Sequence, residues 1–169
     1  MQVPDNQIFL DADVGREFRV LDALSGLGSV PVPTPRWLET DTSVLGHPFF
    51  VMDAVAGTVP TGSPSIHAAG WLAERSPGEL GSAWDSALVA VASVASVDWQ
   101  THLPFLADGV NGTTLATRMA HVGDWYRWSV GDREYPTTDA ALASLLAERP
   151  AETATPELCW GAARLGNTP

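Results

Sequence analysis

A long segment rich in glycine, proline and serine, residues 58–81, interrupts the regular hydrophobic patterns of the sequence. Such a composition favours turns and extended chain, because proline fixes φ and removes a backbone hydrogen-bond donor. Strand-like apolar runs precede this segment, whereas the apolar residues after it recur mainly at helical spacing. The sequence therefore predicts an α+β protein, with two strands in residues 1–57 and a mostly helical part in residues 58–169.

One helix and two strands are predicted before this linker. A helix over residues 14–25 follows Asp13, a good N-cap, and glycines stop it. Its apolar face is made of Val14, Phe18, Leu21 and Leu24. Residues 36–39 predict a first strand, and the apolar run over residues 49–55 is the clearest strand in the chain.

Three helices are predicted after the linker, the first capped by Ser82 and the third by Thr138. Their apolar faces comprise Trp84, Leu88, Val91 and Ala95, then Leu115, Met119 and Val122, then Leu142, Leu145 and Leu146. We also expect a short helix over residues 67–73 inside the linker, and a short strand over residues 158–160.

The composition narrows the class of protein. The chain has 169 residues, of which 45% are hydrophobic, enough for one globular core. A net charge of −11 repels nucleic-acid phosphates, so no nucleic-acid partner is expected. No run of about 18 apolar residues could span a bilayer, and the start lacks the pattern of a signal peptide, so we expect a cytoplasmic protein. Cys159 is the only cysteine, which excludes an internal disulfide, and we expect it in a buried strand.

The last residues, 159–167, hold the most informative motif. In phosphoryl-transfer enzymes of the kinase type, an Asp accepts the substrate hydroxyl proton, and an Asn five residues later holds a magnesium ion. Asn167 stands at the Asn position, whereas Ala162 stands at the Asp position, and its methyl group cannot accept a proton. A plain turn built on Gly161 and Gly166 explains the same residues, so the spacing alone leaves both interpretations open.

Glu17 is a second candidate. Kinases use a helix Glu to pair with a lysine that grips phosphates, but no lysine precedes Glu17. Because Arg16 and Arg19 flank it, an ordinary solvated helix face is the better explanation of Glu17 from the sequence alone. The histidines lack metal-ligand spacing, so no histidine metal site is expected, and the tryptophans are expected in the core.

Several ordered stretches resemble one known family. They are residues 16–24 (REFRVLDAL), 30–33 (VPVP), 45–52 (LGHPFFVM) with Gly57, 96–99 (SVDW) and 160–167 (WGAARLGN). Their order and separations are similar to those of the aminoglycoside phosphotransferase family, also called the phosphotransferase enzyme family, over nearly the whole chain. The branch that is fused to acyl-CoA dehydrogenases looks most similar.

This resemblance implies a partial protein-kinase-like fold. Residues 1–57 would keep part of the N-lobe sheet and the hinge, and residues 58–169 would form part of the helical C-lobe. The implied family activity is the ATP-dependent phosphorylation of a small-molecule hydroxyl, with Mg²⁺ as the metal.

The same resemblance assigns roles to single residues. Met52 would line the back of the adenine pocket, and the Asp53 carbonyl and Val55 amide would bond the adenine edge. Glu17 would be the helix carboxylate. Ala162 falls at the position of the lost catalytic base, and Asn167 at that of the magnesium ligand.

The departures from the family pattern are large. By the resemblance, the chain begins after the Gly-rich hairpin and the phosphate-gripping strand, and it ends before the second magnesium-binding Asp. Together with Ala162, these departures predict a truncated, inactive protein that self-associates through exposed faces and an unpaired strand edge. The alternative is a non-catalytic ligand-binding or protein-binding module on the same scaffold.

Overall fold

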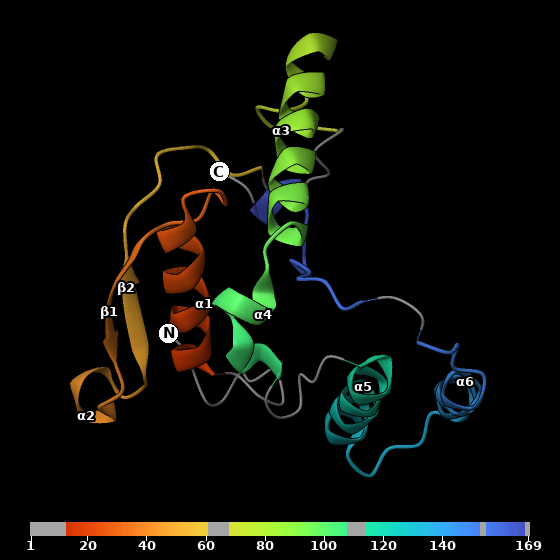
Figure 1. Ribbon diagram of the computed structural model, residues 1–169. Helices are drawn as coiled ribbons and strands as arrows, with labels where there is room; N and C mark the ends of the chain where they lie inside the picture. Colours follow the sequence, from red (N-terminus) through yellow and green to blue (C-terminus); the bar gives the residue numbers. More distant parts are fainter. Residues whose placement is uncertain (1–12, 61–67, 108–113, 153–154, 168–169) are drawn as a thin grey trace.

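The computed structural model describes residues 13–60, 68–107, 114–152 and 155–167 (Figure 1). The first elements are helix α1 (Val14–Leu27), strand β1 (Pro35–Glu39), the short helix α2 (Thr42–Leu45) and strand β2 (Phe49–Met52). Then come α3 (Pro77–Ala95), α4 (Trp99–His102), η2 (Pro104–Ala107), α5 (Leu115–Val130), α6 (Pro136–Ala147) and η4 (Leu165–Asn167). The predicted α+β class is confirmed, with both described strands before residue 57 and a mostly helical part after it.

Helix α1 forms where the sequence predicts it and continues to Leu27. The Asp13 carboxylate accepts a hydrogen bond from the Arg16 backbone amide at 2.9 Å, and Gly28, at φ 67°, provides the left-handed cap. The helix lies against the sheet, and the Phe18 ring meets the Phe50 ring of β2 edge-on, with centroids 6.1 Å apart.

The sheet consists of β1 and β2, paired antiparallel. Its last pair is Pro35 opposite Met52, so the prediction that the second strand continues to residue 55 is wrong. The pairing is already irregular at this end of the sheet, where the register shifts between Pro35 and Trp37. Beyond this pair, the Asp53 amide donates to the Thr34 carbonyl at 2.9 Å, and the chain then leaves the sheet.

Helix α3 begins earlier than predicted, at Pro77 rather than after Ser82. Ser76 and Glu79 form a capping box, in which the Ser76 amide donates to Glu79 Oε2 at 2.9 Å and the Glu79 amide donates to Ser76 Oγ at 3.3 Å. Glycines in the first turns of the helix make this stretch look like a linker in the sequence. In residues 68–73 the chain forms turns, so the helix predicted there is wrong within the described part of that range.

The core lies where four parts of the chain meet: α1, residues 28–33 after it, the end of α3, and the terminal segment, residues 155–167. Its buried members are Leu24, Val30, Val94, Val97 and Leu103. Trp99 and Trp160 pack against this cluster, and the Trp99 indole donates to the Pro156 carbonyl at 2.8 Å. This hydrogen bond ties the terminal segment to the core.

Helices α5 and α6 lie apart from this core (Figure 1). Gly123 is the one residue of these two helices that is buried. The predicted core role of several tryptophans is wrong, since Trp37, Trp84, Trp125 and Trp128 are exposed. The predicted Thr138 cap is also wrong, because α6 begins at Pro136. Among the described helices, none has both the length and the apolar character needed to cross a membrane.

Candidate functional site

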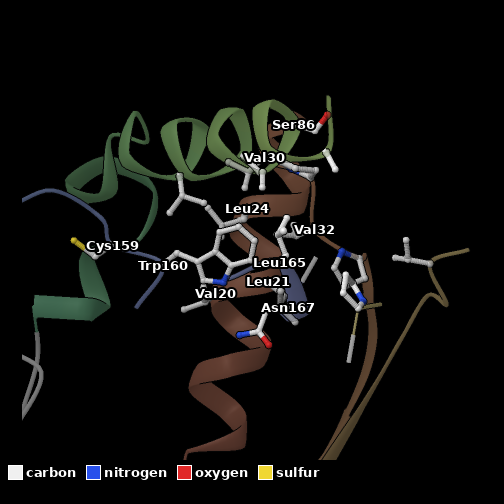
Figure 2. A pocket seen from close by; sticks show the side chains of 18 of the residues that line it. Val20, Leu21, Leu24, Val30, Val32, Ser86, Cys159, Trp160, Leu165 and Asn167 are labelled. Carbon is white, nitrogen blue, oxygen red and sulfur yellow. The ribbon is translucent and has the colours of Figure 1, made fainter. Parts of the chain in front are cut away.

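A cavity of about 840 Å³ lies between α1, residues 30–33, α3 and the terminal segment (Figure 2). Its walls come from the apolar face of α1, from small residues of α3, and from Trp71, Leu158 and Trp160. None of the residues that line it carries a formal charge. Two predicted site residues line this cavity. They are Val55, which follows β2, and Asn167, which lies in the terminal loop, residues 161–167. An apolar lining with a few polar groups is typical of small-molecule sites.

The predicted hinge residues are only partly gathered at this cavity. Val55 lines it, whereas Met52 and Asp53 do not, and the Met52 side chain is 48% exposed. Arg36 Nε donates to Asp53 Oδ1 at 2.7 Å. This hydrogen bond holds the pKa of the Asp53 carboxyl below its usual range. No described residue pairs with the Asp53 carbonyl or the Val55 amide, the groups that the resemblance assigns to the adenine edge.

The terminal loop is closed by its own hydrogen bonds. Asn167 Nδ2 donates to the Ala162 carbonyl at 2.7 Å, and Arg164 Nε donates to Asn167 Oδ1 at 3.3 Å. The Asn167 amide also donates to the Arg164 carbonyl at 2.9 Å. Leu165 between them is only 6% exposed and anchors the loop to the interior. Both ends of the Asn167 side chain are therefore engaged within the loop.

The described residues do not fit a magnesium ion. Mg²⁺ needs several hard oxygen ligands in near-octahedral geometry, but the only side-chain oxygen that Asn167 offers accepts a hydrogen bond from a guanidinium. Across the described ranges, no group of three or more His, Cys, Asp or Glu side chains could hold a metal ion. Ala162 is exposed and does not line the cavity, and its methyl group provides no further ligand.

Glu17 lies on an exposed part of α1, away from the cavity lining. Its side chain has no ion-pair or hydrogen-bond partner in the described part of the chain. The structure thus places Glu17 on a solvated helix face and does not bring it to Asn167. Its role as the helix carboxylate stays a prediction.

Three further residues at the site were missed or misplaced by sequence reasoning. Cys159 is exposed and residues 158–160 form no strand, so the buried-strand prediction is wrong; Figure 2 shows its sulfur turned away from the other labelled side chains. Trp71 lines the cavity, and its buried Nε1 has no hydrogen-bond partner among the described residues. Arg164 donates to Asn167 in the closed loop, which the sequence analysis did not predict. Its being the one charged residue in residues 159–167 is the sequence signal that could have indicated this role.

A helix packed on an antiparallel pair of strands, followed by a mostly helical part that ends in this loop, defines a partial kinase-like fold. The sequence model of the phosphotransferase enzyme family matches residues 5–168, and the chain belongs to this family. The chain is also similar to a crystal structure from Ralstonia eutropha JMP134, assigned as an aminoglycoside phosphotransferase, with 26% identity and a TM-score of 0.60. That match covers 82% of this chain but only 39% of the other protein's length. The predicted family and partial kinase-like fold are confirmed.

Proposed function

We propose that this member of the phosphotransferase enzyme family does not transfer phosphate by itself and binds a small molecule in the cavity beside its terminal loop. Membership of the family implies ATP-dependent phosphotransfer to a small-molecule hydroxyl, with Mg²⁺. The observation that carries the proposal is that the terminal loop has no proton acceptor at residue 162 and is closed by its own hydrogen bonds. Ala162 provides no proton acceptor, and the Asn167 side chain is engaged by Arg164 and by the Ala162 carbonyl.

The catalytic contributions that this chain lacks are large enough to predict inactivity. General-base catalysis is worth roughly a hundred- to ten-thousand-fold in rate, and Ala162 cannot supply it. Phosphoryl transfer depends further on preorganised positive charge, usually a metal ion, around the moving phosphoryl group. In the described residues, no group of three or more His, Cys, Asp or Glu side chains is arranged to hold such a metal.

The cavity favours the ligand-binding alternative. It has the size of a small-molecule site, and its lining includes Val55, which the resemblance assigns to the adenine edge. A ligand that binds only the folded protein raises its melting temperature, so binding is measurable without turnover. Whether that ligand is a nucleotide is the point that the experiment decides.

The test measures phosphate release from Mg-ATP and thermal unfolding, using the same purified chain. We expect release no faster than with heat-inactivated protein. We also expect ATP to give the same melting temperature in Mg²⁺ as in EDTA. Steady product formation by the native chain would overturn the proposal of inactivity. A melting temperature that ATP raises only when Mg²⁺ is present would show that Asn167 still serves a metal.

Exposed apolar side chains on the sheet support the predicted self-association. Trp37 and Val51 are cross-strand partners, 62% and 49% exposed respectively. Neighbouring apolar side chains left in water favour association. We expect elution in size-exclusion chromatography to depend on protein concentration; a sharp monomer peak at all concentrations would contradict this.

A further inference from the structure

We propose that the cavity binds a small amphipathic anion, with its apolar body between α1 and α3 and its anionic head on Arg164, without a metal ion. The head is a carboxylate, sulfonate or phosphate, which share the geometry that a guanidinium recognises. This inference rests on the proposed ligand-binding function and names the chemical class of the ligand.

The cavity lining selects the apolar body. Valine, leucine, alanine, proline and tryptophan side chains make up most of it, and no charged side chain takes part. A charged group inside such a lining would lose its hydration without gaining a partner, at a large cost in free energy. The ligand's charge must therefore lie at the edge of the cavity, and its apolar part inside.

Arg164 supplies a cation at that edge. Its Nε lies 3.3 Å from Oδ1 of Asn167, which itself lines the cavity. Within the described residues, Arg164 forms no ion pair, so its terminal nitrogens are open to an anion. Arg36 and Arg75, by contrast, are already paired with Asp53 and Glu79.

The same geometry explains why no metal is needed. A metal ion at Asn167 would have to share the amide oxygen with the guanidinium, and a divalent cation beside Arg164 would be repelled. The net charge of −11 opposes anions at long range. Salt at about 0.1 M screens that repulsion beyond about 10 Å, while the contact with Arg164 persists.

The experiment compares two fluorescent probes with the same type of apolar body. One is 1-anilinonaphthalene-8-sulfonate, and the other is N-phenyl-1-naphthylamine, which lacks the sulfonate. Both are titrated into the full chain in 0.1 M salt, with EDTA and then with Mg²⁺. We expect one saturable site, tighter for the sulfonate, and no strengthening by Mg²⁺.

Variants separate the head contact from the cavity. Arg164→Gln keeps a donor for Asn167 but removes the charge, and we expect it to weaken sulfonate binding about two- to five-fold, the effect of a solvent-exposed charge pair. Neutral-probe binding should not change. Arg149→Gln, the same change at an exposed arginine that is not hydrogen-bonded to any described residue of the cavity lining, should alter neither affinity. Ala87→Phe, which fills the cavity, should abolish both; Ala90→Leu serves if that variant does not fold.

The results distinguish failure of the Arg164 contact from failure of the proposed ligand-binding function. Equal sulfonate affinity in wild type and Arg164→Gln, or tighter binding with Mg²⁺, overturns the role of Arg164 and leaves the cavity as a neutral site. Binding of both probes that survives a folded Ala87→Phe or Ala90→Leu variant shows that the probes bind elsewhere. That result overturns the ligand-binding function as well.

Discussion

Replacing Asn167 by alanine tests whether its side chain closes the loop or serves a metal. The substitution removes the 2.7 Å hydrogen bond to the Ala162 carbonyl and the 3.3 Å bond from Arg164. A hydrogen bond contributes about 0.5–1.5 kcal/mol net, and these are exposed to water, so we expect a loss of about 1 kcal/mol in unfolding free energy. For a chain of this size, that corresponds to a melting temperature lower by about 2–4 °C.

The assay is thermal unfolding of wild type and Asn167→Ala in EDTA and in Mg²⁺. We expect the same loss in both buffers, because the lost bonds are internal to the protein. Gln100→Ala is a suitable control, since it removes an exposed amide side chain that makes no hydrogen bond with the described residues. A loss that occurs only in Mg²⁺ would refute the loop-closure argument and restore Asn167 as a metal ligand.

The remaining predictions concern the fold. Leu103→Ala should lower the unfolding free energy by about 2–5 kcal/mol in urea titrations, because Leu103 is 0% exposed, while Leu88→Ala at 61% exposure should change little. Ser76→Ala removes a helix cap and should cost about 1 kcal/mol in the same assay. Since Arg36 lowers the pKa of Asp53 from 3.8, the stability from this pair is present above about pH 4 and is lost as the pH falls further. In Arg36→Gln, the unfolding free energy should fall less between pH 4 and lower pH than in wild type. An equal fall in both proteins would mean that the pair does not contribute to stability.

The sequence predicts α1 and β1 well because their signals are local. Asp13 caps the helix and Gly28 ends it, as the residue types alone indicate. The start of α3 was missed because glycines in its first turns give a linker-like composition, although the Ser76–Glu79 capping box was readable. Helical spacing located α5 but could not show whether its apolar face meets a partner, since that depends on contacts between distant segments.

The sequence selects candidate site residues but does not give their conformation. Spacing from a known motif selects Ala162 and Asn167 as candidates. It cannot reveal that Arg164 occupies the amide oxygen of Asn167, because that depends on the conformation of the loop. The cavity is likewise a product of three-dimensional packing, as it joins α1, α3 and the terminal segment.

The most direct test of the account is phosphate release from Mg-ATP by the Ala162→Asp variant beside wild type. Restoring the carboxylate supplies the missing proton acceptor and nothing else. Because Asn167 remains tied to Arg164, we predict release at the rate of heat-inactivated protein for both chains. Steady release by the variant would show that the loop is competent apart from its base, and the account would be wrong.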